Sequence, residues 1–121
     1  MCKILIVDDE EITRNFLYDF LVEEGYPPDL ASDGDEAIEK IKNFGYDLVV
    51  TDMKMPNVSG IEVLKAAKLK NPKSNVIVIT GYSSMENRKE CLKWGASAYL
   101  AKPFQLSEFR EIINKSLLKH L

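Results

Sequence analysis

The 121-residue sequence is poor in cysteine and has no long apolar run. Cys2 and Cys91 lie far apart and form no C-x-x-C pattern, which indicates unpaired thiols in a reducing compartment. No hydrophobic stretch approaches membrane-spanning length, and no signal-peptide pattern precedes the first predicted strand. These absences predict a cytoplasmic protein without disulfides.

The sequence also lacks an excess of positive charge. There are 16 Lys and Arg residues against 19 Asp and Glu, so the formal net charge is -3. A weakly anionic molecule repels nucleic acid backbones, and direct nucleic acid binding is not expected. A lysine cluster formed by Lys65, Lys68, Lys70 and Lys73 is interpreted as a solvated face, without a ligand.

Repeats, low-complexity tracts and Gly/Ser-rich linkers are absent as well. Hydrophobic residues make up 45% of the chain and charged residues 29%, which is typical of a globular domain and not of a disordered one. The length suits one domain that folds without structural metal. We therefore predict a single domain over residues 1–121.

Short apolar runs alternate with stretches of helical period, which indicates β/α units on a parallel sheet. The predicted strands are residues 3–7, 29–31, 47–51, 75–79 and 98–100. The run Ile4-Leu5-Ile6-Val7 has no inside/outside alternation, as expected for a strand covered by helices on both faces. The pattern predicts an α/β fold of five such units.

Five amphipathic helices are predicted between and after these strands. The first ends before Gly25, the second begins near residue 33, the third near Ser59, the fourth spans residues 84–93, and the fifth spans residues 107–118 with Ser107 as its N-cap. Their predicted buried positions are Thr13, Phe16, Leu17, Phe20, Leu21, Ala37, Ile38, Ile41, Ile61, Leu64, Ala67, Phe109, Ile112, Ile113 and Leu117.

Chemically distinctive polar residues follow four of the predicted strands. Asp8 and Asp9 end the first, Asp52 the third, Thr80 the fourth, and Lys102 follows the fifth. Because the carboxyl ends of parallel strands meet at one edge, where open α/β sheets bind ligands, these side chains are expected to converge.

Three converging carboxylates repel one another unless their pKa values rise or a cation neutralises them. A hard ion such as Mg²⁺ or Mn²⁺ suits ligands that are all oxygens. Taken singly, each residue has another explanation: Asp9 could cap a helix, Asp52 could be a turn residue, Thr80 a strand end and Lys102 a solvated lysine. Four such coincidences at one sheet edge are a weaker explanation than a site.

Several short motifs carry a resemblance to a known family. They are residues 4–10 (ILIVDDE), residues 51–56 (TDMKMP), Ser59-Gly60, Thr80-Gly81 and residues 102–104 (KPF). In this order and spacing, the whole chain resembles the receiver domain of bacterial two-component response regulators, of the single-domain chemotaxis or phosphorelay type. The resemblance implies a flavodoxin-like (βα)5 fold with strand order 2-1-3-4-5 and helices on both faces.

The resemblance also implies the chemistry. Asp52 would accept a phosphoryl group from the phosphohistidine of a histidine kinase or histidine phosphotransfer protein. Asp9, Asp52 and the backbone carbonyl of Lys54 look like direct ligands of Mg²⁺, with Asp8 acting mainly through water. Lys102 would pair with the phosphoryl oxygens, and the bond from Lys102 to Pro103 is similar to one that is usually cis.

A conformational switch is implied as well. Thr80 would hydrogen-bond to the phosphoryl group, and Tyr99 matches an aromatic position that packs inward in response. The output face would be the fourth helix, fifth strand and fifth helix. Lys54 and Tyr82 flank the path of attacking water, and bulky Tyr82 is expected to shield the acyl phosphate and prolong its lifetime.

Two other functions are weighed against this one. A stand-alone aspartyl-phosphate phosphatase would need a second Asp two residues after the nucleophile, where Lys54 stands, so a turnover enzyme is not expected. A pure interaction module would not need the complete polar set. A downstream protein or output domain is expected as target, but a free-standing relay, a piece of a longer regulator, a monomer and a phosphorylation-dependent dimer all remain open.

Three further residues have simple interpretations. Cys91 is expected to fill a small apolar space, and Trp94 to anchor the end of the fourth helix. His120 is expected to be solvated.

Overall fold

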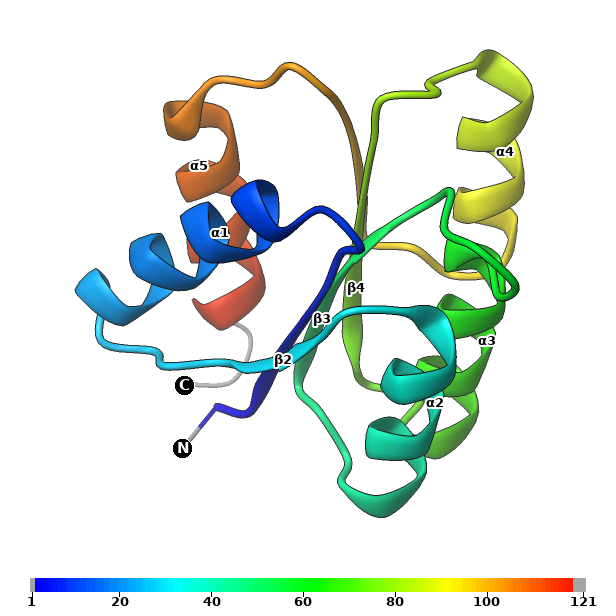
Figure 1. Cartoon of the computed structure of the whole chain (residues 1–121), viewed down its shortest axis with the longest axis horizontal. Coiled ribbons are helices and arrows are strands. Elements are labelled where there is room, and N and C mark those ends of the chain that lie inside the picture. The colour runs from blue at the N-terminus through cyan, green and yellow to red at the C-terminus, as the bar shows by residue number, and fades with distance from the viewer. Residues whose placement is uncertain (1, 119–121) are drawn as a thin grey trace.

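The computed structural model describes residues 2–118, so His120 lies outside the described part. Strands and helices alternate along the chain (Figure 1). In order, the elements are β1 (Ile4–Val7), α1 (Glu11–Glu23), β2 (Asp29–Ala31), α2 (Gly34–Asn43), β3 (Leu48–Asp52), α3 (Gly60–Lys70), β4 (Asn75–Thr80), α4 (Met85–Lys93), β5 (Ala98–Ala101) and α5 (Leu106–Leu118). No helix over residues 2–118 is both long and apolar enough to cross a membrane.

The five strands form one parallel sheet in the order β2-β1-β3-β4-β5. This order confirms the predicted α/β fold class, including the short strand β2. In the register, Ile6 lies opposite Leu30 on one side and Val50 on the other, and Val50 lies opposite Ile77. Every strand therefore ends at the same edge of the sheet.

Helices cover both faces of this sheet. Figure 1 shows α1 and α5 on one face and α2, α3 and α4 on the other. Along β1, Leu5 and Val7 join the core beneath α2 and α3, whereas Ile4 and Ile6 join the core beneath α1 and α5. Two separate cores thus explain why the strand is apolar at every position.

Three details of the helix prediction are wrong. Phe16 is 47% exposed, because it lies toward the amino end of α1 and faces the loop before α5 instead of the sheet. Ser107 is not the N-cap of α5, which begins at Leu106. The predicted stripe of α3 is too narrow, because Val63, which the sequence pattern places at the edge of that stripe, is fully buried. The remaining predicted positions are buried or half-buried, and Cys91 is buried as expected.

Three backbone features support the helix ends and the site. Gly25 and Gly95 have positive φ angles of 88° and 99°, which glycine adopts without strain after α1 and α4. The peptide bond between Lys102 and Pro103 is cis, as the resemblance implied.

The backbone around Gly60 leaves no space for a side chain at this position. A Cβ at this position would overlap the carbonyl oxygen of Asp52 and lie 2.8 Å from Met53 Cα. We expect Gly60→Ala to lower the free energy of unfolding by about 2 kcal/mol or more, as overpacking against backbone does. Urea denaturation measures this change. The matched control is Gly45→Ala, whose Cβ would meet no atom within 4 Å and should change stability by less than about 0.5 kcal/mol; equal effects of the two would contradict the packing argument.

Candidate functional site

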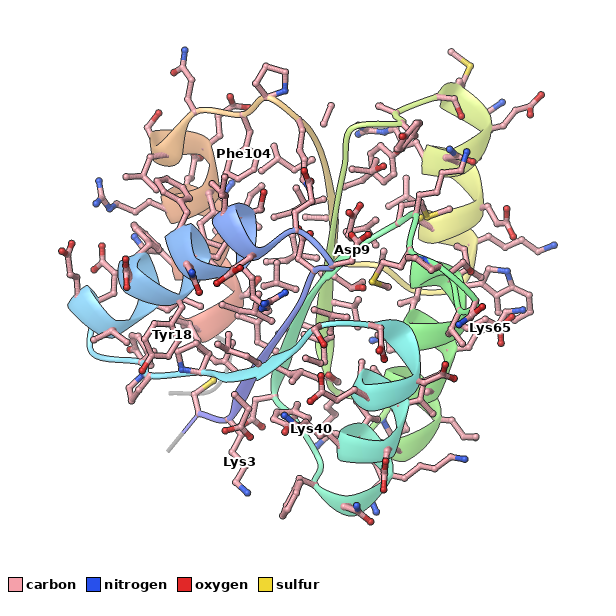
Figure 2. The ribbon with its side chains drawn as sticks, viewed as in Figure 1. Lys3, Asp9, Tyr18, Lys40, Lys65 and Phe104 are labelled. Carbon is pink, nitrogen blue, oxygen red and sulfur yellow. The ribbon has the colours of Figure 1, made fainter. Side chains whose placement is uncertain are left out.

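The parallel sheet brings the predicted polar residues to one edge. Asp8 directly follows β1, Asp52 and Thr80 are the last residues of β3 and β4, and Lys102 follows β5. Figure 2 shows Asp9 at the point where the chain leaves β1 for α1, at this same edge. Asp8, Asp52 and Thr80 are each no more than 6% exposed, so the site is set into the edge.

Lys102 is the centre of the charge arrangement. Its Nζ lies 3.2 Å from Asp8 Oδ2, 3.1 Å from Glu10 Oε1 and 3.5 Å from Asp52 Oδ2. The side chain of Lys102 is 18% exposed, whereas that of Glu10 is 63% exposed. One ammonium therefore balances two buried carboxylates and one at the rim, leaving the cluster with excess negative charge.

Asp8 is held by hydrogen bonds from three directions. Its backbone N–H donates to Ala31 at 3.2 Å, and its Oδ1 accepts from the backbone N–H of Glu10 at 2.9 Å. Its carbonyl oxygen accepts from Nη1 of Arg14 at 2.8 Å. These bonds fix the turn from β1 into α1 and aim the other carboxylate oxygen at Lys102.

Asp52 is positioned by the end of β3 and the loop behind it. Its Oδ1 accepts weakly from the backbone N–H of Lys54 at 3.5 Å. The N–H of Gly60 donates to the Met53 carbonyl at 2.8 Å, which folds the loop back against the strand. One face of the Asp52 carboxylate remains directed toward Lys102.

Three carboxylates present oxygen atoms that all lie within 4.8 Å of one another: those of Asp8, Glu10 and Asp52. Oxygen donors at this spacing fit a hard divalent cation such as Mg²⁺. Asp9 is exposed and is not one of the three, so the cluster differs from the expected ligand set by the substitution of Glu10. Glu10 stands in the quoted motif but was given no role.

Burial changes the proton affinities of this cluster. Desolvation raises the pKa of Asp8 above its ordinary value, although the Glu10 N–H and Lys102 oppose it. Desolvation likewise raises the pKa of Asp52, with Lys102 opposing and Asp8 adding to the increase. For Lys102, burial acts to lower the pKa, but the carboxylates of Asp8 and Asp52 outweigh burial and raise it. The ionised forms of Asp8 and Asp52 are thus disfavoured unless a further cation binds beside them.

Thr80 connects the site to the loop before α4. Its Oγ1 accepts from the backbone N–H of Tyr82 at 2.9 Å, and the Tyr82 carbonyl accepts from Nδ2 of Asn87 at 2.9 Å. The Nζ of Lys54 lies 4.6 Å from the centroid of the Tyr82 ring. The two predicted lifetime residues therefore touch each other beside the site, in a cation–π contact.

Tyr99 lies in β5 and packs against the core beneath α2 and α3. Its hydroxyl oxygen is buried and has no hydrogen-bond partner among residues 2–118. Burying a hydroxyl without a hydrogen-bond partner costs free energy. Because the Tyr99 hydroxyl has no such partner among the described residues, no hydrogen bond fixes the position of this ring.

Arg14 is a second residue that sequence reasoning missed. An arginine in the first turns of a helix reads as an ordinary solvated residue, and no local pattern predicts that it reaches back to the carbonyl of Asp8. Only the path of the chain from β1 into α1 creates this contact.

A doubly wound α/β domain with an acidic, lysine-bridged site at the carboxyl edge is the class that the fold and site define. The protein-family model described as the response regulator receiver domain matches residues 4–114. The chain therefore belongs to the response regulator receiver domain family.

Individual proteins agree with this assignment. The chain is 37% identical to sporulation initiation phosphotransferase F of Bacillus subtilis over 115 residues, covering 95% of this chain and 93% of that one. Other curated relatives are longer, and the chain spans about half or a quarter of their length.

Solved structures share the fold. A CheY-like receiver domain protein from Methanospirillum hungatei JF-1 superposes with a TM-score of 0.93 and 34% identity, over 98% of this chain and 95% of that one. The response regulator TrrA from Thermotoga maritima, solved in complex with Mg(2+)-BeF, has a TM-score of 0.85 and 39% identity, with coverage of 96% and 99%.

The raised carboxyl pKa values generate a prediction about stability. A carboxyl whose pKa is higher in the folded than in the unfolded protein holds its proton longer when folded, so metal-free stability should fall as pH rises from about 4 through the raised values. Asp52→Asn removes one buried charge and should make the metal-free protein more stable than wild type at pH 7. Urea denaturation in EDTA at several pH values measures both trends. Asp19→Asn, an exposed change on α1, is the control, and an Asp52→Asn protein less stable than wild type at pH 7 would refute the idea.

Proposed function

We propose that this receiver domain is a phosphorylation-dependent switch in a two-component system, and that Asp52 is its phosphoacceptor. The observation that carries the proposal is the placement of the Asp52 carboxylate, buried at the carboxyl edge with Lys102 Nζ at 3.5 Å and two further carboxylates alongside. Receiver domains are signalling domains and not classical turnover enzymes. The proposed donor is the phosphohistidine of a histidine kinase or histidine phosphotransfer protein.

In the proposed reaction, an Asp52 Oδ atom forms a bond to phosphorus while the bond from phosphorus to the donor's imidazole nitrogen breaks. The imidazole leaves with the bonding electron pair and takes up a proton. The obstacle is electrostatic, because a carboxylate must approach an anionic phosphoryl group. Lys102 lies within reach of Asp52 and can place its ammonium against the incoming phosphoryl oxygens.

A divalent cation would supply the positive charge that this cluster of carboxylates lacks. Burial raises the pKa values of Asp8 and Asp52, so their charged forms are disfavoured without a cation. Together with Glu10, these residues offer three oxygen atoms at coordination spacing. We propose that Asp8 and Asp52 hold Mg²⁺ (or Mn²⁺), with the Lys54 carbonyl and Asp9 as further ligands carried over from the family pattern. When bound, the cation neutralises charge on the carboxylates and on the phosphoryl oxygens.

The proposed relay starts at Thr80. Its hydroxyl can donate to a phosphoryl oxygen on Asp52, and turning toward that oxygen would weaken the bond that Oγ1 accepts from Tyr82. The loop before α4 would then shift, and Tyr99, whose buried hydroxyl has no hydrogen-bond partner among residues 2–118, could change its packing in response. The proposed output face is α4, β5 and α5, toward a downstream protein or output domain.

A groove beside the site suits a protein donor. It has a volume of about 300 Å³ and lies between α1 and the loop after β5. Its lining residues are Ile12, Thr13, Phe16, Lys102, Pro103 and Phe104. Ile12 is 86% exposed and Phe16 47% exposed, so this groove offers an apolar contact immediately next to Lys102. We propose it as the contact for the phosphodonor.

Phosphorylation itself is tested with a small donor. Incubation with acetyl phosphate and Mg²⁺ should add one phosphoryl group, located by mass spectrometry of peptides, and omission of Mg²⁺ should abolish the reaction. Asp52→Asn should lose the modification. The control Asp47→Asn, at the opposite end of the same strand, should keep it; labelling that persists in Asp52→Asn would rule out the assignment.

The lifetime of the acyl phosphate gives a second test. We propose that the Tyr82 ring, which is 62% exposed and lies 4.6 Å from Lys54 Nζ, shields the site from one approach of water. Tyr82→Ala should therefore speed the loss of phosphate from Asp52 by a factor of about five. Decay after removal of the donor is followed by phosphate-affinity electrophoresis. Met85→Ala is the control, because Met85 is an exposed residue close in sequence to Tyr82, at the start of α4. An unchanged decay rate in Tyr82→Ala would dismiss the shielding role.

A further inference from the structure

The α3–α4 surface, defined by Lys65, Lys68, Leu69, Lys93 and Trp94, differs in charge from the rest of the molecule. Residues 63–85 contain four lysines and no Asp or Glu, although the chain as a whole has a net charge of -3. All 19 acidic residues and 12 of the 16 basic ones lie outside that segment. Residues 60–93, which span α3 and α4, also include Glu62, Glu86 and Glu90, but their seven basic residues exceed these three acidic ones.

The tertiary structure places an aromatic side chain within this basic region. Lys65 Nζ lies 4.1 Å from the Trp94 ring centroid, and Lys93 Nζ lies 5.9 Å from it. Trp94 remains 42% exposed, so part of its side chain is accessible at this surface. Figure 2 shows Lys65 on the outer side of α3, next to α4. Sequence reasoning, which treated the lysines and Trp94 separately, assigned no ligand here.

Contacts of Lys68 with neighbouring residues fix one part of the α3–α4 surface. Lys68 Nζ donates to the carbonyls of Pro72 and Ser74 at 3.2 and 2.8 Å, and the Lys68 stem passes so close to Gly95 that a Cβ there would lie 2.9 Å from it. Leu69, one helical turn after Lys65, is 87% exposed. Two exposed apolar side chains, Leu69 and Trp94, therefore each lie next to Lys65.

We infer that the α3–α4 surface binds an acidic helical segment of a partner protein. Carboxylates of the segment would pair with the ammonium groups of Lys65 and Lys93, and an apolar side chain would cover Leu69 and the Trp94 ring edge. Charge complementarity favours an acidic partner, because residues 60–93 carry seven Lys and Arg residues against three Glu. Nucleic acid is disfavoured, since the charged groups that flank Trp94 are lysines and the whole chain is anionic. This inference is independent of phosphorylation at Asp52.

The sole tryptophan of the chain reports directly on this surface. The probe is a synthetic amphipathic helix of about 15 residues, free of Trp and Tyr, with Leu along one stripe and Glu on both sides of it. Titration should change Trp94 emission saturably, with a Kd on the order of 100 μM, and should shift the amide signals of Lys65 and Leu69. Added salt should weaken binding.

Matched variants decide the outcome. The double change Lys65→Gln and Lys93→Gln should weaken binding at least about fivefold by NMR titration, whereas Lys42→Gln on α2 should not. Asp52→Asn should bind the peptide as wild type does, so a failure of phosphorylation and a failure of this inference are separate results. The inference is overturned by no saturation up to about 1 mM, by equal binding of a peptide with Lys in place of Glu, or by preferred binding of duplex DNA or anionic vesicles.

Discussion

The crowding of carboxylates around a single lysine is the constraint on which the rest of this structure depends. Asp8, Glu10 and Asp52 lie close enough to share Lys102, and burial raises the pKa values of Asp8 and Asp52. A folded protein tolerates such a cluster only if the backbone around it is rigid and the deficit of positive charge can be met from outside. The same deficit makes the cluster suitable for a cation and a phosphoryl group.

The fold supplies the required rigidity. Parallel strands buried on both faces place Asp8 and Asp52 at the same edge, and the two cores hold those strands from opposite sides. Close backbone packing, as at Gly60 behind Asp52, leaves little freedom for the loop that follows β3. In contrast, the elements around Thr80, Tyr82 and Tyr99 are held by few polar contacts. The site thus combines a fixed acidic half with a half that can move, as a switch requires.

The groove, the phosphorylation site and the α3–α4 surface lie on different parts of the domain. The groove adjoins Lys102 through α1, and the α3–α4 surface lies on the other face of the sheet (Figures 1 and 2). A domain arranged in this way can contact a donor on one side and a different partner on the other. Partners of this kind need not compete for the same residues.

The class of fold, the five strands and the edge at which the polar residues gather were all predictable from the order of the residues. Unbroken apolar runs, such as residues 4–7, require helices on both faces of the sheet. Because all strands of a parallel sheet end at one edge, Asp8, Asp52, Thr80 and Lys102 must lie at that edge. Only the tertiary structure decided that Glu10 joins Asp8 and Asp52 while Asp9 is exposed, that Arg14 holds the Asp8 carbonyl, and that Phe16 faces a groove. It alone also brought Trp94 against Lys65. Periodicity records whether a residue faces the sheet, but the direction of a side chain at a turn or helix end depends on neighbours that are distant in the sequence.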